Sequence, residues 1–363
     1  MNRSEASAPE RNASLTEFLE KSRRIEGERL TDSIPKEYFT PRVERGILGF
    51  LLSAGVYGGS VAGILLSQYW LIDVPLWLLA GLGGWGLHCI AHDCGHGSFS
   101  RSRRLNVIVG SLALLPLLYP FHAWRHVHNM HHAHTNSLEL DTDWRPLPPA
   151  MYDRLSLIGK LTYAGTRTWA FWGGTIRYWY VSGFRPGFFP KASMRRDVRH
   201  SIAVTLILGA LYLSTLVLIA GPWSLVAGFL VPLLTTHLWF STTTLMHHSA
   251  SDLPFLDARH WTRNAGKLLM TTDFVYPAPL RLLTHNISVH TPHHVAPAIP
   301  FYNLPKAQEV LKRTYPGMVR EERLTPGALW RILHDLHLHD AENGGFYQGF
   351  DRRPVPPRKD PQP

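Results

Sequence analysis

The sequence predicts an all-α, multi-pass membrane protein with two transmembrane helical hairpins, and three observations support this fold class. No Lys, Arg, Asp or Glu occurs from Ser201 to Ser251, a stretch that soluble domains almost never leave uncharged. A second apolar region, from Ile47 to Ala91, is interrupted by a single charged residue. Lys and Arg concentrate between these two regions. With 45% apolar and 18% charged residues, the composition also excludes a disordered or collagen-like chain.

Each apolar region is long enough for two spans, because a bilayer core of roughly 30 Å requires about 20 residues at the helical rise of about 1.5 Å. Asp73 and Pro75 mark the expected turn in the first region, and Gly221-Pro222 marks the turn in the second. The predicted spans cover residues 47–72, 74–91, 201–220 and 223–246.

A shorter apolar segment, residues 105–121, carries Pro116 and Pro120. Two prolines in so short a segment are incompatible with one unbroken helix. We therefore expect a short re-entrant or interfacial segment that returns to the side from which it entered.

Basic residues predict the orientation. The segment from Asp93 to His200 is rich in Lys and Arg, whereas the turns near Asp73 and Pro222 contain neither. By the positive-inside rule, this segment and both termini are cytoplasmic. Topology then accounts for much of the net charge of +10, and nucleic-acid binding is not needed to explain it. Arg is much more frequent than Lys, which is typical of proteins from bacteria with GC-rich genomes. We therefore expect the protein to lie in a bacterial inner membrane.

The chain is therefore expected to comprise a cytoplasmic N-terminal segment (1–46), a membrane domain (47–320) and a cytoplasmic C-terminal segment (321–363) that ends in a Pro-rich tail. The only cysteines, Cys89 and Cys94, lie at the predicted inner end of a span and cannot form a disulfide framework.

The 21 histidines cluster in three groups on the predicted cytoplasmic side. The groups are HDCGH (92–96), HNMHH (128–132) and HTPHH (290–294), and the last two share one spacing, i, i+3, i+4. On a helix this spacing places imidazoles on one face, where they can bind a common ion. Eight imidazoles exceed the three or four ligands of one zinc site, so the number argues for two metal ions held in a helical cytoplasmic cap.

A redox metal is the better choice for these ions. Imidazole suits Fe, Zn, Cu and Ni alike. The sequence contains no HExxH motif and no nucleophile elbow, which disfavours hydrolysis at a zinc site. Two irons can instead activate dioxygen and remove hydrogen from the unactivated C–H bonds of a hydrocarbon dissolved in the membrane.

The three groups, in this order around two apolar hairpins, resemble the histidine boxes of the integral-membrane fatty acid desaturase superfamily. The contexts PFHAWRHVHNMHHAHTN and HNISVHTPHHV, the latter followed by IPFYNLP, resemble its acyl-lipid, methyl-end (omega) branch. The similarity runs from about Leu48 to Lys312. It implies desaturation of a long acyl chain, with a new cis double bond formed by dioxygen and two electrons at a non-haem di-iron centre. A separate ferredoxin or cytochrome would supply the electrons, because no carrier motif is found in the chain.

The resemblance also implies which residues bind the metal, and the same residues are the expected catalytic residues. They are His92, His96, His128, His131, His132, His290, His293 and His294. Members of the superfamily use a ninth histidine between boxes two and three. The run TTLMHH makes His247 the best match, with His248 and His285 as alternatives.

The sequence departs from the family pattern at Gly97, Met246 and Pro292. The proline matters most, because it would break a helix interior but is tolerated in the first turn. We therefore expect box three to open a helix.

Several nearby residues are candidates to orient the ligands or to line an acyl channel. Candidates for accepting the distal imidazole N–H are Asp93, Glu139, Asp141, Asp143 and Asn286. Candidate channel residues, which aromatic belts at the membrane surface explain equally well, are Trp124, Trp144, Trp239 and Phe240. The C-terminal His334, His337 and His339 share helical spacing but lie outside the boxes, so a structural role is favoured for them.

Two alternative functions remain open. A fatty acyl hydroxylase or carotenoid-type ketolase of the same superfamily would carry the same boxes. A non-enzymatic membrane metal-binding or transport protein would place ionisable residues inside the spans, and His237 is the mid-span example here. Sequence does not specify the position of the double bond, the acyl carrier or the oligomeric state.

Overall fold

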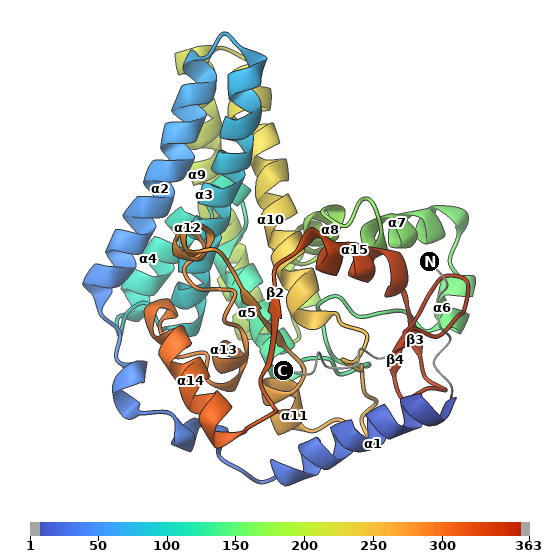
Figure 1. The fold of residues 1–363 in the computed structure, drawn as a ribbon. Helices are drawn as coiled ribbons and strands as arrows, with labels where there is room; N and C mark the ends of the chain where they lie inside the picture. Colours follow the sequence, from blue (N-terminus) through green and yellow to red (C-terminus); the bar gives the residue numbers. More distant parts are fainter. Residues whose placement is uncertain (1–7, 357–363) are drawn as a thin grey trace.

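The computed structural model describes residues 8–356, and its ribbon shows a group of long helices standing on a lobe of shorter elements (Figure 1). The outermost parts of the predicted N-terminal segment and Pro-rich tail, residues 1–7 and 357–363, lie outside the described residues. Throughout, "the lobe" means the described residues outside the four long helices.

Four helices in the described part of the chain are long and apolar enough to cross a membrane, as the sequence predicts. They are α2 (Val43–Leu66), α3 (Trp70–His96), α9 (Ala192–Ala220) and the continuous helix formed by η5 (Leu225–Leu230) and α10 (Val231–His248). The second break lies at Gly221, as expected, where φ is +75°, a conformation that glycine adopts without strain.

The first turn differs from the expected one. It lies at residues 67–69, and both Asp73 and Pro75 are inside α3. Ser67 makes this turn, because its hydroxyl accepts from the N–H of Tyr69 (3.1 Å) and also lies 3.1 Å from the carbonyl oxygen of Tyr69. The proline is tolerated near the start of α3, where its missing N–H removes one hydrogen bond at an exposed helix end.

The segment containing Pro116 is broken, as expected, and no described helix in it is long enough to span. The short helix α4 (Arg103–Ala113) is followed by the turn η3 (Leu115–Leu117) and then by α5 (Phe121–Ala133). Leu118 has a φ of +46°, and this left-handed residue redirects the chain toward α5.

The helix α3 lies at the centre of the long helices and packs against α2, α4, α5 and α10. Small residues allow this close approach. A Cβ atom at Gly81 would lie 2.6 Å from Thr235, and one at Gly84 would lie 2.3 Å from the Thr236 hydroxyl. Helices in membranes commonly associate through such small residues. The packing fixes the ends of α3 and α10 side by side above the lobe.

The lobe is mostly helical, but the all-α prediction misses two small sheets. Strand β1 (Thr272–Val275) pairs in parallel with β2 (Arg320–Arg323), and β3 (Leu338–Asp340) pairs antiparallel with β4 (Phe346–Gln348). The helices of the lobe are α1 (Ala8–Arg24), α6 (Pro149–Asp153), α7 (Leu157–Arg167), α8 (Gly173–Gly183), α11 (Arg263–Leu268), α12 (Ala278–Leu283), α13 (Thr291–Val295), α14 (Leu304–Thr314) and α15 (Pro326–Asp335), besides α4 and α5.

Candidate metal centre

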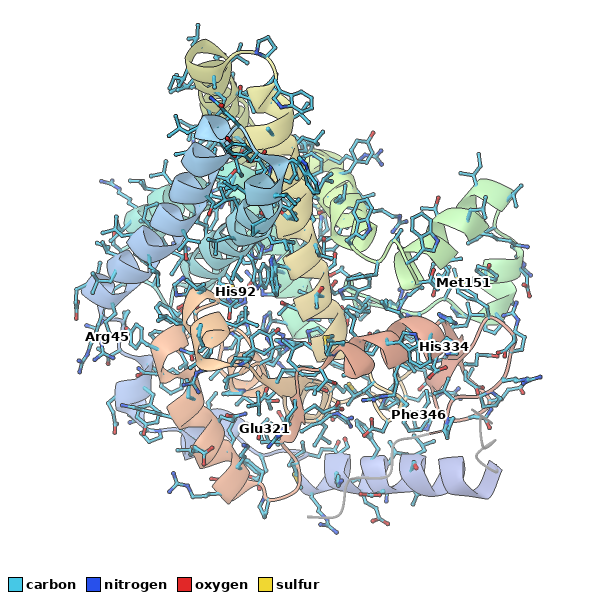
Figure 2. The ribbon with its side chains drawn as sticks, turned by 45° about the horizontal axis from the view of Figure 1, so that its top comes forward. Arg45, His92, Met151, Glu321, His334 and Phe346 are labelled. Atoms are coloured by element: carbon cyan, nitrogen blue, oxygen red, sulfur yellow. The ribbon has the colours of Figure 1, made fainter. Side chains whose placement is uncertain are left out.

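The three histidine boxes meet where the long helices join the lobe, at the position of His92 in Figure 2. Box one forms the end of α3, which stops at Gly97 because that residue adopts a φ of +75°. Box two lies in the second half of α5. Box three opens α13, with His290 as its N-cap and Pro292 in its first turn, so the expected helix start is confirmed.

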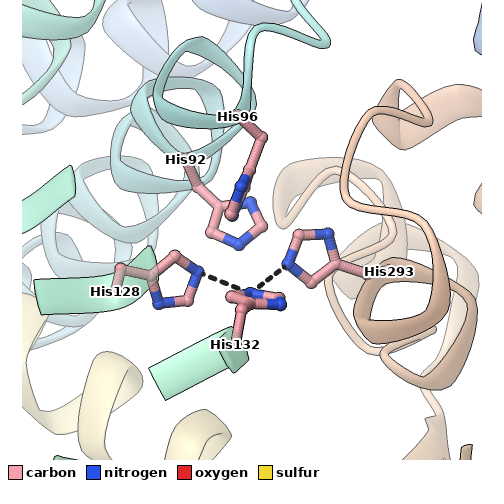
Figure 3. A group of neighbouring side chains, drawn as sticks. All are labelled: His92, His96, His128, His132 and His293. Atoms are coloured by element: carbon pink, nitrogen blue, oxygen red, sulfur yellow. Dashed lines mark hydrogen bonds between the residues drawn. The ribbon is translucent and has the colours of Figure 1, made fainter. Parts of the chain in front are cut away.

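Five histidines form a first cluster, shown in Figure 3. They are His92, His96, His128, His132 and His293, and each offers a ring nitrogen within 4.8 Å of the others. The Nε2 atom of His132 lies 3.0 Å from Nε2 of His128 and 2.9 Å from Nε2 of His293. Figure 3 shows the five rings converging on one point from three separate segments.

A second cluster consists of His131, His248 and His294, whose ring nitrogens also lie within 4.8 Å of one another. The Nε2 atoms of His131 and His248 are 3.2 Å apart. His290 adjoins this cluster, because its Nε2 atom lies 3.1 Å from Nε2 of His248 and 3.0 Å from Nε2 of His294. Both clusters are largely shielded from solvent.

Boxes two and three each contribute to both clusters. In box two, His128 and His132 belong to the first cluster and His131 to the second. In box three, His293 belongs to the first, whereas His290 and His294 lie at the second. All eight box histidines are thus brought together, in two groups, which is the arrangement that two metal ions require.

The donor set fits a metal ion in each cluster. Both ring nitrogens of His92 and Nε2 of His96 are buried and have no hydrogen-bond partner among residues 8–356. Buried polar atoms are seldom left unpaired, and imidazole nitrogens facing each other at about 3 Å need a shared cation or proton. An all-imidazole set suits divalent transition metals.

Electrostatics favour the neutral form of most of these rings. Burial lowers the pKa values of His128, His132, His293 and His294, and neighbouring imidazoles lower them further. A neutral imidazole keeps a lone pair for a metal, so the site is prepared for cation binding at neutral pH.

Asp141 orients His131, as the sequence suggests. Its Oδ1 atom accepts a hydrogen bond of 2.7 Å from Nδ1 of His131, and both side chains are fully buried. Burial lowers the pKa of His131, but the charge and hydrogen bond of Asp141, together with the charge of Asp143, more than offset this and raise it overall. Because Nδ1 carries the proton, Nε2 points into the second cluster with its lone pair free.

Thr135 plays the same role for His294 and was not predicted. Its hydroxyl donates to the carbonyl oxygen of His131 (3.0 Å), so its oxygen can accept from Nδ1 of His294 (3.1 Å). The residue lies one helical turn after His131, a relation that could have been read from the sequence.

Asp273 holds box three from β1 and was also missed. Its Oδ1 atom accepts from the N–H groups of His290 and Thr291, and Oδ2 accepts from Nε2 of Gln308 at 2.7 Å. These bonds satisfy donors at the start of α13 that the helix itself leaves unpaired. Burial raises the pKa of Asp273 to about 6, although the hydrogen bonds partly oppose this.

Asp93 and Asn286 hydrogen-bond to the backbone after box three, at Phe301. Within residues 8–356, neither side chain makes a hydrogen bond to a box histidine. Oδ2 of Asp93 accepts from the N–H of Phe301 (2.9 Å), and the Asn286 amide donates to the carbonyl of the same residue (3.2 Å). Oδ1 of Asp93 is 3.8 Å from Nδ1 of His92, beyond hydrogen-bond distance. Glu139 is exposed.

The three candidates for a ninth ligand occupy different positions. His248 lies in the second cluster. The buried ring of His247 stacks on Phe274, with centroids 5.8 Å apart, and neither of its nitrogens has a partner among the described residues. His285 hydrogen-bonds to the Ser53 hydroxyl in α2 at 2.7 Å and lies outside both clusters.

Of the candidate aromatic residues, Trp124 contacts the site. Its ring stacks on His128 at a centroid distance of 4.8 Å and an interplanar angle of 19°. Phe240 stacks on Trp85 within the long helices. The indoles of Trp144 and Trp239 donate to the Thr244 hydroxyl and the Leu78 carbonyl. The C-terminal histidines lie outside both clusters, and His337 and His339 contact backbone carbonyls.

Comparison with known proteins identifies the family. Residues 68–325 match the model of the fatty acid desaturase family. The chain is 34% identical over 330 residues to an sn-1 oleoyl-lipid 12-desaturase of Picosynechococcus sp., covering 91% of this chain and 94% of the relative. It is 33% identical to the sn-1 oleoyl-lipid 12-desaturase of Synechocystis sp., with 86% of this chain and 88% of the relative covered. It is 32% identical to a chloroplastic omega-6 fatty acid desaturase of Arabidopsis thaliana, with 89% and 71% covered. The chain therefore belongs to the fatty acid desaturase family, as its three histidine boxes suggest, and is an oxidoreductase of the acyl-lipid omega branch.

Proposed function

We propose that this chain introduces a cis double bond into a long, already monounsaturated acyl chain of a membrane lipid. The observation that carries the proposal is the pair of largely buried all-histidine clusters at the ends of α3 and α10 that adjoin the lobe. The relatives named as oleoyl-lipid 12-desaturases support a monounsaturated substrate.

The clusters divide nine histidines into five and four. We assign His92, His96, His128, His132 and His293 to one iron and His131, His248, His290 and His294 to the other. His248 takes the place expected for His247, because its Nε2 atom faces three other cluster nitrogens. Bound iron would supply the redox chemistry that activates dioxygen.

The protein's own residues supply orientation and shielding. Asp141 and Thr135 hold protons on Nδ1 of His131 and His294 and leave Nε2 of both rings free for metal. Trp124 covers His128, and Asp273 fixes the start of α13. Burial keeps bulk water away from the reacting positions, which limits side reactions of an activated oxidant.

A cavity of about 510 Å³ with a mixed apolar and charged lining lies near the end of α10 and has room for part of an acyl chain. It lies between the end of α10, β1 and α15. Met246, two residues before His248, and Phe274, on which His247 stacks, line it, whereas the two histidines do not. The charged part of its wall comes from Arg320, Glu322, Arg331 and Asp335, and Arg320 forms ion pairs with Glu322 and with Asp252 behind it.

The hydroxylase or ketolase alternative uses the same clusters and differs in the fate of the substrate radical. Desaturation removes a second hydrogen, whereas hydroxylation adds oxygen, and the outcome depends on sub-ångström placement of the chain. A transport role is disfavoured, because the ionisable residues concentrate at the inner helix ends.

The decisive experiment is expression in a host that lacks this activity, followed by mass spectrometry of the lipids under oxygen. A diene that has lost two hydrogens relative to the substrate supports the proposal, whereas a dominant product with one added oxygen contradicts it. The purified protein should hold about two irons per chain. His131→Ala and His293→Ala should lose metal and activity, and the control His334→Ala, outside both clusters, should not. One equivalent of zinc with full activity would contradict the iron assignment.

We further propose that both termini and the lobe are cytoplasmic and that a separate ferredoxin or cytochrome donates the electrons. Cys94 is buried, so orientation is best tested with introduced cysteines. Cysteine at the exposed Gln68, in the first turn, should react with an impermeant thiol reagent in intact cells, whereas cysteine at the exposed Arg101 should react only after permeabilisation. The reverse pattern would refute this orientation.

A further inference from the structure

A cavity of about 260 Å³ lies beside the start of α5, and no box histidine lines it. His122 lines it, and at about 100° per residue His122 is half a turn of rotation from His131. The other walls come from α4 and α9, and the lining residues are Val107, Ile108, Ser111, Leu112, His122, His200, Ser201, Val204 and Leu208.

In both helices that form the walls, α4 and α9, basic residues come first and apolar residues follow. The helix α4 begins with Arg103 and Arg104 and continues with apolar residues. The helix α9 has its last charged residue at Arg199, and its uncharged part begins immediately afterwards. His200 and Ser201 line the cavity at this boundary, and Val204 and Leu208 line it one and two turns further on. The cavity therefore crosses the level at which the hydrocarbon of a bilayer would begin.

The apolar end of the cavity borders surface that would face lipid. Ile108 is 58% exposed, and the apolar part of α9 is largely unburied by protein. Apolar side chains exposed on a membrane-spanning helix face acyl chains, so this end is accessible from the bilayer.

Two arginines, neither of which lines the cavity itself, lie near its polar end. Arg125 is close enough to Arg103 and His122 to interact electrostatically with both. Burial, followed by the effect of Arg125, lowers the pKa of His122 to about 4, so the positive charge comes from the arginines. The buried Nδ1 atom of His122 has no partner among the described residues. Asp197, which is 3.6 Å from Nε2 of His126, also lies close enough to Arg125 and His122 to offset part of this positive charge.

We propose that this cavity binds one anionic glycerophospholipid of the surrounding bilayer. Its phosphate would lie beside Arg103, Arg125 and His122, and the first part of an acyl chain would lie between α4 and α9. A phosphate complements the arginines, and a chain segment fills the apolar end. No box histidine lines the cavity, so this lipid would be distinct from the substrate. The backbone N–H of His122 donates to the Ser201 hydroxyl at 3.1 Å, so a bound lipid would brace the junction of α5 with α9.

The proposal can be tested by native mass spectrometry of the full-length, metal-loaded protein titrated with phosphatidylglycerol or phosphatidylcholine of identical acyl chains. We expect one phosphatidylglycerol per chain to be retained about tenfold more strongly than phosphatidylcholine, as one or two membrane-surface cations would favour. Glycerol phosphate, which lacks acyl chains, should not be retained.

Two variants probe the two ends of the cavity. Arg103→Gln removes exposed charge, and Val204→Phe fills the apolar end; each should weaken phosphatidylglycerol retention about tenfold or more. The matched control is Arg24→Gln, an exposed arginine of α1. Metal content and melting temperature report whether each variant folds. If Val204→Phe does not fold, the surface variant Arg103→Gln still tests the proposal. Equal retention of both lipids, or unchanged retention in Arg103→Gln, would overturn the proposal. Lipid retention is measured independently of desaturation. A failure of the lipid-binding proposal can therefore be distinguished from a failure of the proposed reaction.

Discussion

The hydrogen bond between Asp141 and His131 offers the sharpest test of the metal centre. Asp141→Ala removes the acceptor of the 2.7 Å bond and also the acceptor for the N–H groups of Asn136 (2.6 Å) and Asp143 (2.9 Å). The alanine variant therefore perturbs the fold as well as the ligand. Asp141→Asn is the smaller change, because its Oδ1 can still accept from Nδ1 of His131 and from the N–H of Asp143 while the charge is lost. Its amide NH2 cannot accept from the N–H of Asn136, so the melting temperature is needed for this variant as well.

The expected sizes follow from these contacts. Loss of a group that orients a ligand typically weakens metal binding about 10- to 100-fold, which corresponds to about 1.4–2.7 kcal/mol. We expect this range for Asp141→Ala. A hydrogen bond to a charged group contributes about 1 kcal/mol more than a neutral one, so Asp141→Asn should weaken iron binding by about fivefold.

Iron affinity can be measured by anaerobic competition with a chelator, and the melting temperature of the metal-free protein separates the effect on folding. Asp143→Asn is the matched control, because this half-buried carboxylate is two residues away and makes no hydrogen bond to a box histidine among the described residues. Iron binding by Asp141→Asn and Asp141→Ala equal to that of the unaltered protein would refute the orienting role. A loss in Asp143→Asn as large as in Asp141→Asn would show that net charge, rather than the bond, matters.

Three further outcomes are expected. His248→Ala should lose about half of the bound iron, whereas His247→Ala should retain it; elemental analysis distinguishes the two, and the reverse order would contradict the assignment. Asp93→Ala should release the chain after box three and lower iron occupancy, and Asp93→Asn, which keeps an acceptor for the N–H of Phe301, should restore it; equal losses in both would argue against this bond. In the metal-free protein, the raised pKa of Asp273 stabilises the fold below about pH 4, and this contribution, up to about 3 kcal/mol, is lost as the pH rises through about 6. Asp273→Asn should remove that component from melting curves recorded between pH 4 and 7, and identical pH dependence in both proteins would show that the group does not titrate in this range.

Features that depend on local periodicity could be predicted from the sequence. The spacing of His128, His131 and His132 requires a helix, and the structure has one. Pro292 restricts box three to a helix start, where it is found. Both inferences use residues within one or two turns, so no long-range information was needed.

Features that depend on pairing between distant segments could not be predicted. Asp273 precedes box three by 17 residues and reaches it because β1 pairs with the polar strand β2, whose sequence REER carries no apolar alternation. The first turn was misplaced for a different reason. The hydropathy pattern places the turn at the charged Asp73. The chain instead turns at Ser67, whose hydroxyl can hydrogen-bond to the backbone of Tyr69.

The division of boxes two and three between the two clusters explains why each of these boxes needs three histidines. Positions i and i+4 are separated by about 40° around a helix, whereas i+3 lies on the other side of i by about 60°. In box two, His128 and His132 can therefore share one ion while His131 turns toward the other. In box three, His290 and His294 share the second ion and His293 turns toward the first. Box two thus presents two histidines to the first ion and one to the second, whereas box three presents one histidine to the first ion and two to the second. Each box would therefore bridge both ions. Movement of either α5 or α13 would disturb both metal sites together, and the buried bonds of Asp141 and Asp273 hold these two helices in place.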